Sequence, residues 1–195
     1  VINASALKHV PICEENVFES VKTNVIGHQN VIEAVSTFDD IETLIFVSTD
    51  KACKPINVYG MCKAISEQLY VNYSKQQNDI KVVLVRYGNV LESTGSVIPF
   101  FQSKSKLRLM PITDVRMTRF MITIEQGVNL VWHAFKDSLG GEVYVHKIPS
   151  MKITDIAKAI NPEANHEIIG NRPGEKIHEV MISQEDAMSS LEYGW

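Results

Sequence analysis

The sequence predicts an α/β protein built on part of a doubly wound parallel sheet, followed by a smaller mixed α/β region. Short apolar runs that do not alternate with polar residues, such as Leu44–Val47, are typical of strands buried on both faces of a parallel sheet. Long helical patterns separate these runs, and a helical crossover between two strands requires parallel pairing. The 195 residues, 45% of them hydrophobic, suffice for one sizeable core.

The first half of the chain alternates strands with long helices. We expect strands over residues 1–4, 43–47 and 81–87, helices over residues 17–36 and 58–77, and a loop over residues 5–11. In the second of these helices, Ile65, Leu69 and Tyr73 are expected to face inward. Asn24 interrupts the apolar stripe of the first helix, so its amide either reaches a loop or ligand or makes a plain structural contact.

The second half mixes short elements with loops, as expected of a substrate-binding region. Thr123 is expected to cap a helix that ends near Ser138, and Thr154 a shorter one that ends near Ile160. We also expect a helix over residues 98–105 and strands over residues 142–146 and 167–169.

Polar residues follow the strand at Leu44–Val47, where ligands bind in open α/β sheets. Tyr59 and Lys63 then lie four residues apart, on one face of the next helix. An ammonium beside a phenol favours the phenolate and lowers the phenol's pKa, which would suit proton transfer. A Tyr and a Lys at this spacing also occur by chance on helix surfaces, but their position just after a strand end favours the functional interpretation.

Asp50 and Lys51 are adjacent in the loop after that strand. On an extended strand their side chains would point to opposite faces, but in a loop both can converge on a ligand. A carboxylic acid beside an amine could protonate a departing hydroxyl and remove a proton from carbon. The alternative is a solvated pair of loop charges.

Further polar residues could bind a phosphorylated ligand. Guanidinium groups suit phosphate oxygens, and Arg116, Arg119 and Arg172 are the candidates, although each could be a surface charge. Glu175 could accept hydrogen bonds from a ribose diol. Lys8 and His9 come just after a strand end, where they could meet a cofactor or a sugar.

Composition excludes several classes of function. A net charge of −4 and a pI of about 5.9 provide no basic footprint for nucleic acid. The three cysteines and six histidines lack metal-ligand spacing, so we expect no metal and reduced thiols in a cytoplasmic protein. No apolar run reaches the roughly 18 residues that span a bilayer. The chain begins without methionine and contains no glycine-rich phosphate-binding turn, so we expect a fragment.

The motifs together resemble a known family. YGMCK has the YxxxK pattern of the extended short-chain dehydrogenase/reductase superfamily, whose sheet is of the Rossmann type. STDKACKPINVYGMCK, with ALKHVP before it and VRYGNV, PITDVRMTRF, KIPSMKITDIAKAI and RPGEKIHEVMI after it, resembles the soluble UDP-N-acetylglucosamine 4,6-dehydratases that invert C-5. These enzymes begin pseudaminic acid biosynthesis, for bacterial surface glycans or flagellin glycosylation.

The resemblance implies a reaction and roles for these residues. NADP, or alternatively NAD, would take hydride from C-4 of the sugar and return it to C-6 after water is lost across C-5 and C-6. Tyr59 would be the base at the C-4 hydroxyl, assisted by Lys63, while Thr49 would orient the sugar. Asp50 and Lys51 would be the acid and the base of the elimination. Related dTDP-glucose dehydratases carry Asp-Glu there, and membrane-anchored retaining relatives generally carry Met at the tyrosine position.

The same resemblance implies binding residues and a domain organisation. The cofactor would contact Ala4, Ser5, Ala6, Lys8, Tyr59 and Lys63. The UDP-sugar would contact Lys8, His9, Asn89, Arg116, Met117, Arg119, Arg172 and Glu175. Residues 1–90 would form a partial NADP-binding domain with the catalytic residues, and residues 91–195 mostly the nucleotide-sugar region, interleaved with further elements of the sheet. A homo-oligomer is expected.

Two positions depart from the family pattern. The family usually reads GNVxGSRGSV, whereas this chain reads GNVLESTGSV, with Glu92 for glycine and Thr94 for arginine. An added anion and a lost cation could weaken binding of UDP. Glu92 and Thr94 favour the alternative of a catalytically impaired homologue. A nucleotide-sugar epimerase of the same superfamily is the other alternative.

Overall fold

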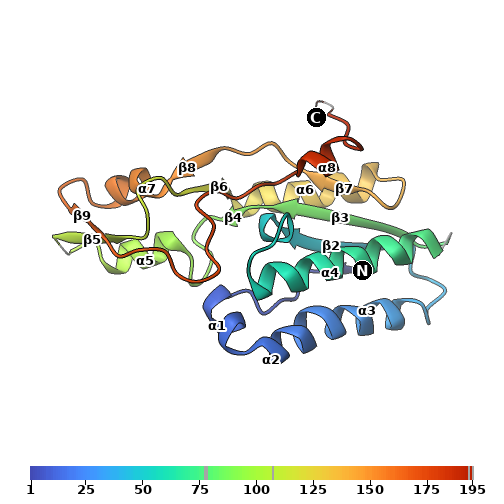
Figure 1. Cartoon of the computed structure of the whole chain (residues 1–195). Helices are drawn as coiled ribbons and strands as arrows, with labels where there is room; N and C mark the ends of the chain where they lie inside the picture. Colours follow the sequence, from blue (N-terminus) through green and yellow to red (C-terminus); the bar gives the residue numbers. More distant parts are fainter. Residues whose placement is uncertain (77–78, 107, 193, 195) are drawn as a thin grey trace.

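A computed structural model describes residues 1–76, 79–106, 108–192 and 194. Its centre is a four-stranded parallel sheet of order β1-β2-β3-β7 (Figure 1). The strands are β1 (Ile2–Asn3), β2 (Thr43–Thr49), β3 (Lys81–Tyr87) and β7 (Val143–Val145). Strands β2 and β3 pair along their whole length, from Thr43 opposite Lys81 to Thr49 opposite Tyr87. The predicted α/β fold class with a doubly wound parallel sheet is confirmed.

Helices cover both faces of this sheet (Figure 1). One face carries α1 (Val10–Glu15), α2 (Val17–Val21), a π-helical turn η1 (Lys22–Ile26), α3 (Gly27–Val35) and α4 (Val58–Gln76). The other face carries α6 (Ile124–Asp137). No described helix has both the length and the hydropathy that a bilayer crossing requires.

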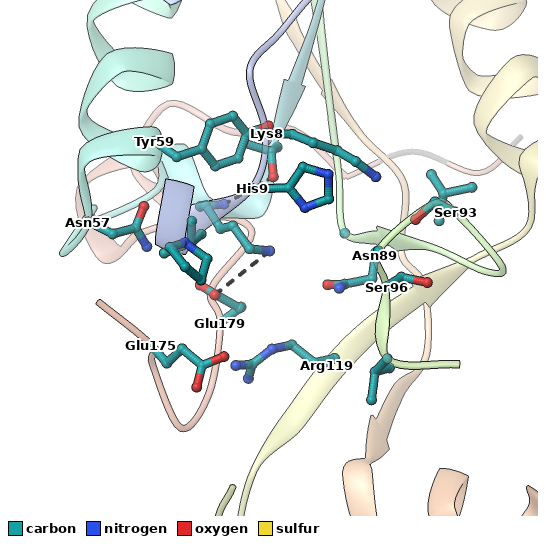
Figure 2. A pocket seen from close by; sticks show the side chains of 18 of the residues that line it. Lys8, His9, Asn57, Tyr59, Asn89, Ser93, Ser96, Arg119, Glu175 and Glu179 are labelled. Carbon is teal, nitrogen blue, oxygen red and sulfur yellow. Dashed lines mark hydrogen bonds and ion pairs between the residues drawn. The ribbon is translucent and has the colours of Figure 1, made fainter. Parts of the chain in front are cut away.

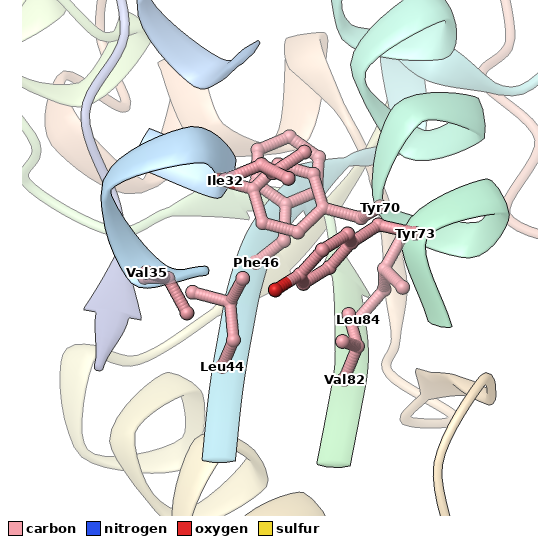
Figure 3. Packing of buried hydrophobic residues seen from close by; sticks show 8 residues of the cluster. All are labelled: Ile32, Val35, Leu44, Phe46, Tyr70, Tyr73, Val82 and Leu84. Atoms are coloured by element: carbon pink, nitrogen blue, oxygen red, sulfur yellow. The ribbon is translucent and has the colours of Figure 1, made fainter. Parts of the chain in front are cut away.

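Two apolar clusters hold the helices on the sheet because neighbouring strand residues point to opposite faces. Leu44 and Phe46 of β2 pack against α3 and α4, where Phe46 stacks on Tyr70 with ring centroids 4.4 Å apart (Figure 3). Ile45, between them, packs with Leu130 of α6. The carboxyl ends of β2 and β3, with their polar residues, therefore lie side by side at one edge of the sheet.

The second region lies beyond the carboxyl ends of these strands (Figure 1). It contains β4 (Asn89–Val90), β6 (Thr118–Ile122) and β8 (Ser150–Lys152) in one sheet, and β5 (Leu109–Ile112) and β9 (Asn165–Ile168) in another. Helices α5 (Val97–Ser103) and α7 (Ile153–Ile160) pack on them around a separate apolar cluster. A short helix, α8, spans Gln184–Ala187. The domain division at residue 90 stays a prediction.

Several local expectations were wrong. Helix α1 begins at Val10, inside the loop expected over residues 5–11, and has a proline in its first turn, where a missing backbone N–H does no harm. Ile65 is 51% exposed, because the face of α4 that packs inward carries polar Ser66 and Glu67 instead. Thr154 does not cap α7; that helix follows Lys152 directly and has no side-chain cap.

Other expectations were confirmed. Thr123 caps α6, and its hydroxyl and the Gln126 side chain form a reciprocal capping box. The helical pattern over residues 17–36 continues through η1, where Asn24 turns inward and reaches a loop. Helix α4 has the predicted start; Gln77, its predicted end, lies outside the described residues.

Candidate active site

The turn after β2 brings three of the predicted catalytic residues together. Thr49 ends the strand, and Asp50–Ala52 form a short 3-10 turn, η2. Oδ1 of Asp50 accepts hydrogen bonds from Thr49 Oγ1 and Lys51 Nζ, both at 3.0 Å. Asp50 is fully buried, and its Oδ2 has no hydrogen-bond partner among the described residues. One buried carboxylate oxygen therefore links a hydroxyl to an ammonium.

Helix α4 lies directly against this turn. A Cβ at Gly60 would be 2.3 Å from the Lys51 carbonyl oxygen, so only glycine allows this approach. Two side chains hold the first turn of the helix: Asn57 Oδ1 accepts from the Gly60 N–H, and Glu14 Oε1 from the Val58 N–H, both at 2.7 Å. Tyr59 is thereby fixed beside the Asp50–Lys51 turn.

Burial governs the protonation of Tyr59 and Lys63. It raises the pKa of Tyr59, as does the nearby Asp50 carboxylate, while a hydrogen bond with Thr49 opposes them. Burial lowers the pKa of Lys63 to about 7, although Glu67 acts in the opposite direction. Lys63 Nζ donates to the Val47 carbonyl at 2.8 Å and lies 4.0 Å from the centroid of the Phe46 ring. The expected lowering of the Tyr59 pKa was therefore wrong for this structure, because desolvation dominates.

A cavity of about 620 Å³ opens between the carboxyl edge of the sheet and the second region. Most of the predicted site residues line it: Ala4, Ala6, Lys8, His9, Thr49, Lys51, Tyr59, Lys63, Asn89, Met117, Arg119, Arg172 and Glu175. Ser5, Asp50 and Arg116 do not belong to this lining. The Ser5 hydroxyl donates to Asn3, and Asp50 lies behind Thr49 and Lys51. The Arg116 side chain is 71% exposed and pairs with Asp114.

The loop after β1 forms one wall of the cavity and is held by Asn24. The Asn24 amide accepts from the Leu7 N–H and donates to the Leu7 carbonyl, both at 2.8 Å. Because a side chain that satisfies both backbone groups of one residue fixes its orientation, Ala6 and Lys8 on either side are fixed as well.

The opposite wall comes from the second region. Arg119 is buried, and its Nη1 donates to the carbonyls of Thr118 and Ile177. Arg172 pairs with Glu175 at 2.5 Å. In Figure 2 the Arg119 and Glu175 side chains point toward one another across the lower part of the cavity. A guanidinium and a carboxylate placed this way could bind anionic and hydroxyl groups of one ligand.

Sequence reasoning missed two residues of the site as individuals. Glu179 lines the cavity although it is only 7% exposed, and its Oε1 lies 3.9 Å from Lys51 Nζ. It belongs to RPGEKIHEVMI, one of the motifs that carry the family resemblance, but no role was predicted for Glu179. Asn57 joins the two walls, since its Nδ2 donates to the Gly174 carbonyl at 2.9 Å. Its position just before a helix was the available signal.

Comparison with known proteins shows the family of the chain. The family described as "Polysaccharide biosynthesis protein" matches residues 1–194. The chain belongs to this family.

Individual relatives of the polysaccharide biosynthesis family carry different activities. The chain is 48% identical to UDP-N-acetylglucosamine 4,6-dehydratase (inverting) of Campylobacter jejuni, over 99% of the chain and 59% of that enzyme. It is 37% identical to UDP-glucose 4-epimerase of Rickettsia canadensis, over 100% of the chain and 59% of that enzyme. The X-ray structure of Pen from Bacillus thuringiensis matches with a TM-score of 0.93 and 34% identity, over 100% of this chain and 64% of that one. The chain thus spans about three fifths of the length of these curated relatives.

The loop that departs from the expected family pattern lies at the cavity rim. Glu92 has a φ of +59°, a left-handed conformation that glycine adopts more easily, and its side chain is exposed outside the cavity lining. Thr94 lines the cavity. Gly95 has a φ of +72°, and a Cβ there would be 2.3 Å from His9 Cε1. The rim therefore lies in close contact with His9, and the side chain at position 94 affects the cavity more directly than the one at position 92.

Proposed function

We propose that this chain provides the catalytic and nucleotide-sugar-binding part of an NADP-dependent UDP-N-acetylglucosamine 4,6-dehydratase that inverts C-5. The observation that carries the proposal is the placement of two proton-transfer pairs on one cavity. Tyr59 and Lys63 lie on helix α4, and Lys51 lies on the turn that packs against it, with Asp50 behind. The inverting dehydratase of Campylobacter jejuni, at 48% identity, supports the assignment.

The residues around the β1 edge fit the nicotinamide ribose of such a cofactor. Lys63 Nζ donates one hydrogen bond to Val47, which leaves ammonium protons for ribose hydroxyls. Ala4 and Ala6 are small and leave the wall of the cavity open to an approaching ring. We expect Ala4, Ser5, Ala6, Lys8, Tyr59 and Lys63 to hold the cofactor, which when bound would accept hydride from C-4 and return it to C-6.

The chain's own residues then move protons. Tyr59 would take the proton of the C-4 hydroxyl as its phenolate, and the resulting 4-keto group acidifies C-5. Because burial and Asp50 oppose the phenolate, a positive charge on Lys63 would have to offset them in the loaded site. Lys51 removes the C-5 proton while the C-6 oxygen bond breaks, and Asp50 supplies the proton with which hydroxide leaves as water. Thr49 lies on the cavity wall, and its hydroxyl donates to Asp50 Oδ1, so it would pass that proton forward once this hydrogen bond reverses its direction. After hydride has returned to C-6, water on the face opposite Lys51 would protonate C-5, which gives inversion.

The second region would bind the UDP group. His9 and Asn89 lie on the cavity near the sugar end, and Arg119, Met117, Arg172 and Glu175 lie on the far wall. Guanidinium groups match phosphate oxygens, and the Glu175 carboxylate can accept from ribose hydroxyls. Arg116 would have to leave Asp114 to reach the same ligand.

We also expect a homo-oligomer in a reducing compartment such as the cytoplasm. Phe18, Ile26, Met61 and Ile65 are large apolar side chains that are each at least 47% exposed on the helices covering one face of the sheet. Such a surface is typical of contact with a second copy. The three cysteines are free and buried, as in proteins of reducing compartments.

One experiment tests the proposed reaction. The protein in its full native length is incubated with UDP-N-acetylglucosamine and NADP, and the product is analysed by mass spectrometry. Loss of one water molecule is the expected result. An unchanged mass together with an altered sugar configuration would instead support an epimerase, which the Rickettsia canadensis relative makes the second candidate. Cofactor binding without turnover would indicate an impaired homologue.

A further inference from the structure

Four charged side chains form a row of alternating sign beneath the cavity. Asp50 Oδ1 lies 3.0 Å from Lys51 Nζ, and on the other side of that ammonium Glu179 Oε1 lies at 3.9 Å. Lys176 Nζ follows, 3.3 Å from Glu179 Oε2, and it also donates to the Cys53 carbonyl at 2.8 Å. Of these four, only Lys51 and Glu179 line the cavity. Figure 2 shows the Glu179 side chain there. The two outer members are hidden behind them.

Burial makes Glu179 costly as a mere ion-pair partner. Its side chain is 3% exposed, and a buried carboxylate loses more solvation than a single ion pair returns unless its geometry is very good. Here the Glu179 oxygens lie within ion-pair distance of two cations, but Oε2 lacks a well-aligned hydrogen bond. Lys51 already has a carboxylate partner in Asp50. A second carboxylate is therefore more than the charge of Lys51 alone requires.

The two carboxylates differ in what they can do to Lys51. Asp50 is the residue before Lys51, so it holds the ammonium from the strand side independently of the position of the second region. Glu179 comes from a segment more than a hundred residues away and faces the ammonium from the second region. Its attraction for the ammonium therefore acts from the side of the wall that carries Arg172 and Glu175.

We propose that Glu179 is a positioning residue for Lys51: its carboxylate orients the Lys51 amine into the cavity, and the Lys176 ammonium on the other side of Glu179 weakens its attraction for Lys51. The proposal rests on the proposed function for the role of Lys51 as the base at C-5. It assigns to RPGEKIHEVMI a task beyond binding the nucleotide, because Arg172 and Glu175 occupy the same segment as Lys176 and Glu179.

The charge of Lys51 can be measured without turnover. The rate of Lys51 acetylation by acetic anhydride is followed against pH by mass spectrometry of the Lys51 peptide, with exposed Lys158 as the internal reference. Removal of a neighbouring anion disfavours the ammonium form of an amine, so Glu179→Gln should raise the rate of Lys51 acetylation about tenfold. Lys176→Met removes a cation that competes for Glu179, and it should lower the rate by about threefold.

Glu175→Gln is the matched control. This carboxylate lies in the same segment and lines the same cavity, but it pairs with Arg172 rather than with Lys51. In Glu175→Gln, Lys51 should be acetylated at the same rate as in the unaltered protein. Equal rates for Glu179→Gln and Glu175→Gln, or changes of the same sign for Glu179→Gln and Lys176→Met, would overturn the proposal. Should Glu179→Gln fail to fold by circular dichroism, Lys176→Met decides alone, and an unchanged or faster rate contradicts the role.

The full-length enzyme gives a second readout. A base must be deprotonated to act, so Glu179→Gln, which removes a neighbouring anion, should shift the acidic limb of the kcat profile to lower pH, with a smaller change in KM. The charged groups that face this pair are Asp50 and Lys176, and the other charged groups along the same wall are Arg119, Arg172 and Glu175. If acetylation responds as expected but no variant dehydrates UDP-N-acetylglucosamine, the positioning role stands and the proposed reaction fails.

Discussion

The two walls of the cavity hold their charged groups in different ways. In the catalytic corner, residues 47–63, Asp50 and Lys63 are almost completely buried and bonded to neighbours fixed by β2 and α4. In the outer loops, residues 89–97 and 170–175, Arg172 is 62% exposed and its partner Glu175 is three residues away. The corner is preorganised by the fold, whereas the outer loops depend on local pairs that a ligand can exchange. We therefore expect substitutions in the corner to affect the chemical step and stability, and those in the outer loops to affect mainly binding.

The largest effect should come from Tyr59→Phe, which removes a hydroxyl from the corner without changing the packing of the ring. Loss of a general acid–base group reduces turnover by about 10²- to 10⁴-fold. Tyr73→Phe is the control, because Tyr73 lies buried on the same helix and its hydroxyl has no hydrogen-bond partner among the described residues. Steady-state kinetics on the full-length protein should show kcat falling for Tyr59→Phe alone; equal activity of both variants would remove Tyr59 from the mechanism.

Gly60→Ala should have the next largest effect, on stability. The added methyl would lie 2.3 Å from the Lys51 carbonyl oxygen, so helix α4 must move away from η2. Overpacking of this kind lowers the free energy of unfolding by about 3 kcal/mol. Gly27→Ala is the matched control: its methyl would be 3.5 Å from the nearest atom, in helical backbone, and should stabilise by about 0.5–1 kcal/mol. Urea unfolding measures both, and equal midpoints would show that the corner is not rigid.

Lys63 gives the corner a pH dependence whose sign follows from burial. Its pKa falls from 10.5 to about 7 on folding, so between these values the unfolded chain binds more protons than the folded one. Stability contributed by this site therefore rises with pH above 7, by at most about 1.4 kcal/mol per pH unit. The unfolding free energy of the unaltered protein minus that of Lys63→Met should become more positive from pH 7 to 8.5. A constant difference would mean that Lys63 stays charged in the folded protein.

The corner was also the part that could be predicted from sequence. Apolar runs and helix signals gave β2, β3 and α4, and their order placed Thr49, Lys51 and Tyr59 at one edge because parallel strands end together. Glu179 could not be found in this way, since no periodicity says which residue of a loop folds back on a strand end. Burial of Asp50 behind Lys51 was equally invisible, because adjacent loop residues can face the same way or not.

The loop predicted over residues 5–11 and the predicted lowering of the Tyr59 pKa were wrong for a related reason. Loop signals such as Pro11 do not distinguish a break from the first turn of a helix. The effect of Lys63 on Tyr59 was inferred from spacing alone, but desolvation depends on everything packed around the pair. Local patterns thus predict elements, while charge states require the assembled surroundings.

The smallest effects should arise in the outer loops, at the two positions that depart from the family pattern. Glu92→Gly relieves a left-handed backbone and should stabilise by about 1 kcal/mol without changing KM, because the side chain does not line the cavity. Thr94→Arg returns a cation to the lining and should lower KM for the UDP-sugar by about threefold, with kcat unchanged and with less benefit at high salt. Arg108→Gln, on an exposed arginine outside the cavity lining, is the control and should change neither KM nor kcat. If Thr94→Arg raised kcat instead, the outer loops would contribute to the chemical step. The assignment of chemistry to the catalytic corner and of binding to the outer loops would then be wrong.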